Sequence, residues 1–162
     1  TFLGGGGITD NGSVFGPPDA PEGSQAAILQ GGTAEFSTTV SGFEAGVTYS
    51  LSFEAAGRAN GAADFQVWLD GTLLDFDGSN TLTPAVGSYA TFTSSEFTTS
   101  GGSLTLTFDG TAAGTSFVDD IRFNFVAEAI PEPCTTLFAT LGLTVLLSLR
   151  RRSTPIGPHS EG

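Results

Sequence analysis

The sequence contains one cysteine, Cys134, one histidine, His159, and no methionine. Both the cysteine and the histidine follow Pro133. The residues before Pro133 therefore cannot form a Ser-His or Cys-His nucleophilic pair, nor a metal site that contains histidine. They cannot form a disulfide either, which leaves the compartment open, because disulfides are common outside the cell but not required there.

A pair of carboxylates is the remaining route to catalysis, since two such groups can hydrolyse a glycosidic bond. Glu54 or Glu96 with an aspartate would supply a pair, but no spacing in the sequence singles one out. The glycine run in "LGGGG" is neither a GxGxxG nor a Walker A loop between a strand and a helix, and gives no support for nucleotide binding. The sequence therefore predicts a protein that is not an enzyme.

Positive charge is scarce as well. The chain has five arginines and no lysine against 17 acidic residues, which gives a net charge of −12. Only Arg58 and Arg122 precede the arginine cluster at 150–152. Because nucleic-acid binding relies on clustered Lys and Arg, this charge excludes nucleic acid as an expected partner.

The first residues, "TFLGGGG", lack the basic region and apolar stretch of a signal peptide, so Thr1 is expected to be a processed or artificial start. Residues 1–24 are rich in Gly and Pro and show no sustained periodicity. They predict a loop-rich lead-in, with one short strand near Val14 and Phe15.

From Gln25 to residue 126 the sequence consists of short segments rich in Thr, Val, Phe and Leu, separated by Gly or Asp-Gly. Apolar and polar residues alternate in these segments, which is typical of half-buried antiparallel strands. Asp70-Gly71 is a two-residue hairpin signal. The pattern predicts an all-β fold, an antiparallel β-sandwich of the jelly-roll type with about eight strands. The side chains expected to face inward are Tyr49, Leu51, Phe53, Phe65, Val67, Leu69, Leu104, Leu106, Phe108, Phe117, Ile121, Phe123 and Phe125.

The strand "AGVTYSLSF", the hairpin "VWLDGTLL" and the closing strand "VDDIRF" are similar to those of galactose-binding-like jelly rolls, which include many non-catalytic carbohydrate-binding modules. The resemblance covers Gln25 to Phe125. It implies a jelly-roll body that is a sugar binder, an adhesion module or a structural domain, because this fold hosts all three.

The same resemblance implies a structural calcium ion at Asp119, since similar domains often hold calcium through an aspartate at the start of the last strand. Ca²⁺ takes about six to eight oxygen ligands. Alternation places Asp119 on the side of Ile121 and Phe123, where an unpaired charge is costly. The alternative is that Asp119 lies at the rim of the strand, solvated or accepting backbone N–H groups.

Trp68 is the only tryptophan, and alternation places it on the face opposite the core. An exposed indole is a stacking platform for a sugar ring, and Gln66 and Asp70 would hydrogen-bond the sugar hydroxyls beside it. The alternative is that Trp68 packs under a loop or against a sheet edge.

The C-terminal part of the sequence has three sections. Residues 127–133 form a linker with a Pro-Glu-Pro motif, and residues 134–149 form one uncharged apolar segment. As a helix that segment would extend about 24 Å, a little less than the ~30 Å hydrocarbon core of a bilayer. A core helix of the sandwich is the alternative, but a helix that is apolar on all sides needs burial on all sides. Residues 134–149 are therefore predicted to be a transmembrane helix, with 150–162 as a basic stop and cytoplasmic tail.

This order of triplet, apolar helix and arginine cluster resembles the PEP-CTERM sorting signal of Gram-negative bacteria. The resemblance implies export, membrane anchoring until processing by an exosortase, and then release to the cell surface or extracellular matrix, often with exopolysaccharide and biofilm. The ten residues after the arginines are a longer extension than usual, and Cys134 is either lipidated or apolar filler. The matching residues are Pro131, Glu132 and Pro133 in the triplet and Arg150, Arg151 and Arg152 in the basic stop.

Together these features predict an exported surface or matrix protein whose body is a non-catalytic module for extracellular polysaccharide. The alternative is a structural or adhesive component of a biofilm matrix without a small-molecule site.

Overall fold

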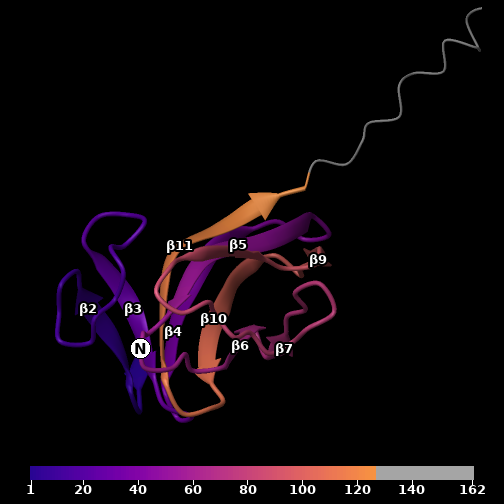
Figure 1. Ribbon diagram of the computed structural model, residues 1–162. Helices are drawn as coiled ribbons and strands as arrows, with labels where there is room; N and C mark the ends of the chain where they lie inside the picture. Colours follow the sequence, from indigo (N-terminus) through magenta and orange to yellow (C-terminus); the bar gives the residue numbers. More distant parts are fainter. Residues whose placement is uncertain (127–162) are drawn as a thin grey trace, which may run out of the picture. The chain divides into compact units, whose positions relative to one another are not determined.

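The computed structural model describes residues 1–126, which fold as an all-β sandwich (Figure 1). Sheet A has the strand order β1-β4-β10-β6-β7, and sheet B has the order β2-β3-β11-β5-β8, with β9 also paired to β5. All of these strand pairs are antiparallel, so the predicted fold class is confirmed. The strands are β1 (Phe2–Leu3), β2 (Gly6–Asp10), β3 (Gln25–Gln30), β4 (Glu35–Phe43), β5 (Thr48–Gly57), β6 (Phe65–Leu69), β7 (Thr72–Leu73), β8 (Ala90–Thr93), β9 (Phe97–Thr98), β10 (Gly102–Gly110) and β11 (Thr115–Phe125).

The core between the sheets is built mainly from phenylalanine and leucine, as alternation predicts. Phe53 of β5 contacts Phe108 of β10 edge to face, with ring centroids 5.1 Å apart. The predicted inward positions on β5, β6 and β10 are confirmed, because their side chains are buried or packed against the core. Aromatic rings in edge-to-face and tilted pairs fill the space between the sheets densely, and this packing stabilises the sandwich.

The faces predicted for β11 are wrong in part, because the strand contains a bulge. Asp119 pairs with Glu54 and Arg122 with Ser52, so three steps along β11 oppose two steps along β5. Asp120 takes up the extra residue with a φ of 49°. A bulge of this kind shifts the alternation of side chains by one position.

Before the bulge the inward residue is Val118, which lies in the core between the sheets, and after it Phe123 packs against the same core. Phe117 points to the outer face of sheet B and is nevertheless fully buried there. Ile121 and Phe125, predicted to face inward, are exposed by 37% and 64%.

Residues 1–24 are not only a lead-in, because β1 and β2 lie in them and belong to the two sheets. β1 pairs with β4, and β2 pairs with β3. The glycines between them cross over the β3–β4 connection at close range. A Cβ atom on Gly5 would lie 2.0 Å from the carbonyl oxygen of Gln30, and one on Gly6 would lie 2.1 Å from that of Glu35. The glycine run therefore serves close backbone packing.

The short strand predicted near Val14 and Phe15 is absent from the described residues, which instead form turns there. This segment, residues 11–24, covers part of the outer face of sheet B. Phe15 packs, together with Tyr89, against a buried cluster on that face. The members of the cluster are Ala26, Ile28, Ala56 and Phe117.

Both arginines of the described part hold this segment in place. Arg58 donates a hydrogen bond to the carbonyl oxygen of Val14 at 3.1 Å and lies over the Phe15 ring. Arg122 forms an ion pair with Glu22 at 3.6 Å. The part of the outer face of sheet B around Ala26, Ile28 and Phe117 is therefore covered by the protein's own chain.

Within residues 1–126, no helix has the length and apolar character needed to cross a membrane. The predicted linker, the transmembrane helix at 134–149, the sorting triplet and the arginine cluster lie outside the described residues.

Candidate functional site

The outer face of sheet A is open and carries rows of hydroxyl groups. The register places Ser103 beside Ser41 and Thr105 beside Thr39. The hydroxyls of Ser41 and Ser103 are hydrogen-bonded at 3.0 Å. We call this surface the hydroxyl face; its members are Ser37, Thr39 and Ser41 of β4 and Ser103, Thr105 and Thr107 of β10.

Trp68 continues one of these rows. Thr107 pairs with Ser37 on one side and with Trp68 on the other, so the three side chains lie in line across β4, β10 and β6. Trp68 alternates with the buried Val67 and Leu69 and is half-buried, not enclosed. The predicted outward orientation of Trp68 is therefore confirmed, whereas its ligand role stays a prediction.

Gln66 lies on the same face as Trp68 but is already engaged, since its amide donates to the Thr81 hydroxyl at 3.3 Å. In the register Gln66 pairs with Asp109, and Asp109 with Glu35. This row gives one end of the open face an acidic edge, which favours neutral over anionic ligands.

Asp70 lies away from Trp68 and Gln66, at a different surface. It forms a two-residue turn with Gly71, and both residues have a positive φ, 48° and 78°. Leu69 pairs with Thr72 across this turn, so the predicted Asp-Gly hairpin is confirmed. The turn places Asp70 at the rim of a pocket between the ends of the two sheets.

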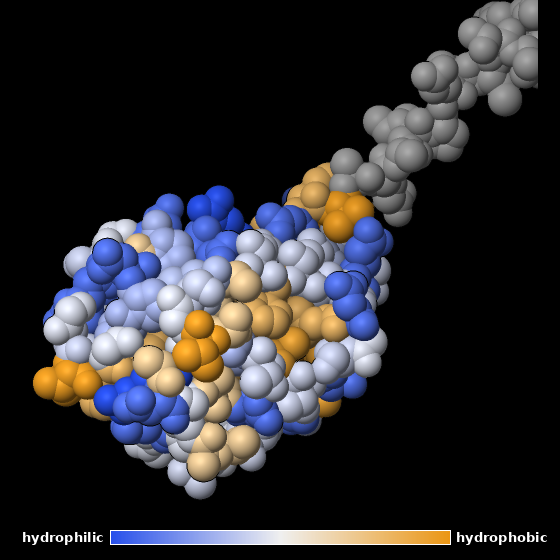
Figure 2. Space-filling model, in the orientation of Figure 1, coloured by the Kyte–Doolittle hydropathy of each residue, from blue (hydrophilic) through white to orange (hydrophobic). Residues whose placement is uncertain are grey.

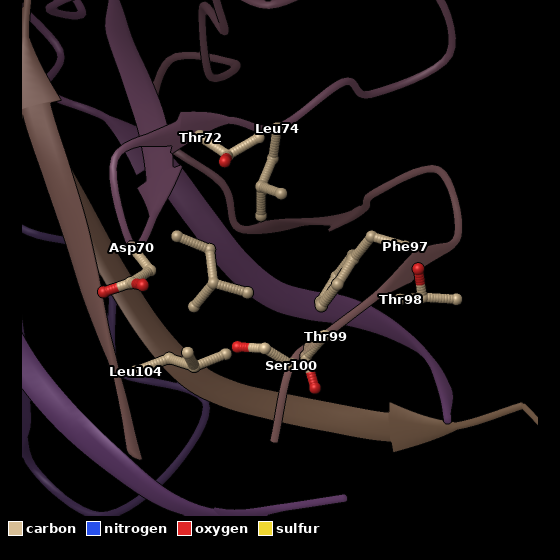
Figure 3. A pocket seen from close by; sticks show the side chains of 9 residues that line it. Asp70, Thr72, Leu74, Phe97, Thr98, Thr99, Ser100 and Leu104 are labelled. Carbon is tan, nitrogen blue, oxygen red and sulfur yellow. The ribbon is translucent and has the colours of Figure 1, made fainter. Parts of the chain in front are cut away.

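We call this cavity the end pocket; it has a volume of about 170 Å³ (Figure 3). In Figure 3 Leu74, Phe97 and Ser100 point toward a common space, and Asp70 lies at its edge with its carboxylate directed away from Phe97. Figure 2 shows a hydrophobic area on the side of the molecule where Figure 1 places β6, β7 and β9. The lining residues are Leu69, Asp70, Thr72, Leu74, Phe97, Thr98, Thr99, Ser100 and Leu104.

Asp119 has a structural partner. Its Oδ2 atom accepts a hydrogen bond from the backbone N–H of Glu22 at 2.9 Å, which matches the alternative stated for it above. Burial raises the pKa of Tyr89 to about 12, and the negative charge of Asp119 adds to this effect. The hydroxyl oxygen of Tyr89 is buried without a hydrogen-bond partner among the described residues.

The surroundings of Asp119 offer few side-chain ligands for a calcium ion among the described residues. Among residues 1–126, no three His, Cys, Asp or Glu side chains lie close enough together to hold a metal. Ca²⁺ needs about six to eight oxygen ligands, and one oxygen of Asp119 already accepts the Glu22 N–H. The calcium site at Asp119 stays a prediction that these donors do not support.

Sequence reasoning did not find the hydroxyl face or the end pocket. The signal for the hydroxyl face is present in "EFSTTVS" and "SLTLTF", where every second residue of the strand is Ser or Thr, but the pairing of the two strands is needed to see the rows. The end pocket joins residues 69–74 to residues 97–104. No local sequence pattern predicts that contact.

The architecture is that of known sugar-binding domains. It is similar to the CBM22-1 xylan-binding domain of Paenibacillus barcinonensis Xyn10C, with a TM-score of 0.55 and 15% identity over 80% of this chain and 86% of that one. The chain has the fold of carbohydrate-binding modules.

Two further modules show the same likeness. The CBM6cm-2 module of Cellvibrio mixtus lichenase 5A, in complex with cellotriose, matches with a TM-score of 0.52 and 18% identity over 76% of this chain and 88% of that one. A CBM36 module in complex with calcium and xylotriose matches with a TM-score of 0.51 and 18% identity, over 76% and 99% of the two chains. No protein-family model and no curated protein matches the sequence. At these identities the likeness establishes the jelly-roll fold.

Proposed function

We propose that this protein is a non-catalytic module that binds a neutral polysaccharide across the hydroxyl face, with Trp68 as the stacking platform. The row Ser37–Thr107–Trp68 is the observation that carries this proposal. It places a half-buried indole in line with hydroxyl groups on an open sheet face.

The spacing of the hydroxyl face suits an extended chain. Neighbouring strands lie about 4.8 Å apart, and outward residues on one strand recur every ~6.7 Å. A polysaccharide chain crossing the strands therefore meets a regular array of donors and acceptors. The apolar C–H face of a pyranose ring stacks on an indole, and the acidic row of Glu35 and Asp109 repels acidic sugars.

The probes follow from the structural neighbours, one described as xylan-binding and another in complex with cellotriose. Binding of xylan and cellulose oligomers is measured by calorimetry on the full chain, kept soluble with a mild detergent. We expect Trp68→Ala to weaken binding about tenfold or more, because a stacking contact is lost. Phe125→Ala, which removes an aromatic ring that is 64% exposed on sheet B, is the control and leaves binding unchanged.

A second pair of variants tests the hydroxyls. Thr105→Val removes one hydroxyl from the hydroxyl face while keeping a β-branched side chain, and Thr93→Val does the same at an exposed position of β8. We expect only Thr105→Val to weaken binding. If no neutral glycan binds, or if Trp68→Ala binds as the wild type does, the alternative of a structural or adhesive matrix component takes the place of this proposal.

The same proposal extends to localisation, on the strength of the sequence from Pro131 to Arg152. The protein is exported in a Gram-negative bacterium, held in the membrane through residues 134–149, cut by an exosortase, and released to the surface or matrix. The test expresses the chain behind a signal peptide in hosts with and without an exosortase. Immunoblots of cell fractions then follow its size and location.

We expect a shortened surface form only in the host that has the exosortase. Pro131→Ala combined with Pro133→Ala abolishes the shortening, whereas Pro155→Ala, beyond the arginines, leaves it intact. Equal processing in both hosts contradicts the sorting proposal without affecting the glycan proposal.

A further inference from the structure

The end pocket has an aromatic wall that is held in one orientation. The Phe97 ring stacks near Tyr49, with centroids 6.5 Å apart, and meets Phe123 edge to face at 6.5 Å. Leu69, Leu74 and Leu104 are nearly buried and supply the apolar part of the lining. A ring packed in this way loses little conformational freedom when a ligand binds.

Two polar groups of the pocket, Asp70 and Ser100, are available to a ligand, whereas the Thr99 hydroxyl is engaged with the backbone of Glu44 and Gly101. The carboxylates of Asp64, Asp75 and Asp119 accept hydrogen bonds from the protein. The Asp70 carboxylate accepts none from a described residue and takes part in neither ion pair of residues 1–126. The Ser100 hydroxyl points into the same space in Figure 3.

We propose that the end pocket binds a single neutral pyranose ring, either a free monosaccharide or the end of a glycan chain. The ring places its C–H face on Phe97, and its hydroxyls donate to Asp70 and bond to Ser100. The volume of about 170 Å³ lies below the ~300–1,000 Å³ of pockets for drug-sized ligands. It therefore suits one ring, with the rest of any attached chain outside the pocket.

The charge of the pocket sets its specificity. Asp70 is its only charged side chain among the described residues that line it, and none of them is basic. A uronic acid would bring a second carboxylate close to Asp70 without a cation to offset the repulsion. The pocket consequently selects neutral sugars against their acidic counterparts.

This site is separate from the hydroxyl face. Trp68 faces outward from sheet A, whereas the end pocket lies between the ends of the sheets. The β6–β7 hairpin and β10 connect the two surfaces, but none of the residues that define the hydroxyl face lines the pocket. The end pocket can therefore bind a ring whether or not a polysaccharide binds along the hydroxyl face.

The experiment is an NMR titration of the ¹⁵N-labelled full chain in detergent micelles with glucose, xylose, their methyl glycosides and glucuronate. We expect shifts of the backbone amides of residues 70–72 and 97–100 with the neutral sugars and none with glucuronate. A methyl glycoside that binds as well as the free sugar assigns the pocket to a chain end. One that fails to bind assigns it to a free monosaccharide.

Asp70→Asn is the decisive variant, because asparagine tolerates the positive φ of the turn and the fold is kept. We expect an affinity for glucose lower by about tenfold, since charge-assisted hydrogen bonds are lost. Asp77→Asn is the matched control, since Asp77 also precedes a glycine and has a φ of 52° but lies outside the pocket.

Trp68→Ala leaves these amide shifts unchanged, which separates this site from the hydroxyl face. The proposal is overturned if no sugar shifts these amides at its highest soluble concentration, if glucuronate binds as well as glucose, or if both asparagine variants behave alike.

Discussion

The carboxylate of Asp119 accepts a hydrogen bond from the backbone N–H of Glu22 at 2.9 Å, across 97 residues of sequence. This contact ties the segment 11–24 to the last strand. Together with the contacts of Arg58 and Arg122 it keeps part of the outer face of sheet B covered. The outer face of sheet A carries no such segment over its rows of Ser and Thr.

Removing the Asp119 carboxylate should loosen this segment. We expect Asp119→Ala to lower the free energy of unfolding by about 1 kcal/mol, the usual effect of losing a solvent-accessible hydrogen bond. Hydrogen exchange at the Glu22 amide should become faster. Asp19→Ala, at an exposed position of the same segment, is the control. Equal effects of the two substitutions contradict a specific role for Asp119.

Calcium removal tests the metal prediction directly. The described donors around Asp119 do not complete a calcium site, so we expect the melting temperature to be the same in EDTA and in excess Ca²⁺, measured by circular dichroism. A lower melting temperature in EDTA that Ca²⁺ restores, and that Asp119→Ala abolishes, would return Asp119 to the role of ligand.

The glycine run should be sensitive at some positions and tolerant at others. A methyl group on Gly6 would lie 2.1 Å from the Glu35 carbonyl oxygen, whereas one on Gly7 would make an ordinary contact of 3.5 Å with Ile28. We expect Gly6→Ala to destabilise the fold by about 1–3 kcal/mol or more and Gly7→Ala to change it by less than about 0.5 kcal/mol. Urea denaturation measures both, and similar losses would contradict the close-packing explanation.

Tyr89 should make stability fall at high pH. Its pKa is raised to about 12 in the folded protein from an ordinary value of 10. The unfolded state therefore releases this proton first. The contribution of Tyr89 to stability is complete below pH 10 and is lost as the pH rises from 10 to 12.

Tyr89→Phe removes the titrating group and a buried hydroxyl oxygen without a partner. We expect little loss of stability at pH 7 and a shallower decline of the free energy of unfolding between pH 10 and 12. Denaturant melts at several pH values measure both. An unchanged decline would assign the high-pH loss to other groups.

The strands with strict alternation could be predicted from the sequence, and those with an irregularity could not. Leu51 and Phe53 face the core as their pattern requires. The bulge at Asp120 has no such signal, because it is defined by the register of β11 against β5, which the sequence of β11 alone does not contain. In the same way the glycine run predicts a loop from its sequence. Its role in close packing depends on the carbonyl groups beside it, which only the structure shows.

The candidate site shows the same division. The outward position of Trp68 follows from the alternation in "FQVWL", and the turn at Asp70-Gly71 follows from its residue types. The separation of Trp68 and Asp70 onto different surfaces cannot be predicted from the sequence. It depends on residues 97–100, which approach the turn only in the folded chain.

The register of β6 has a consequence for how this protein can change. Phe65, Val67 and Leu69 point inward while Gln66 and Trp68 point outward, and Asp70 begins the turn. Inserting or deleting one residue in β6 would reverse every side chain of the strand at once. The indole would then enter the core, and the aspartate would leave its turn. If the proposed sites bind sugars, related sequences should vary the ligand preference by substitution at Trp68 and Asp70, while keeping the length of β6 the same.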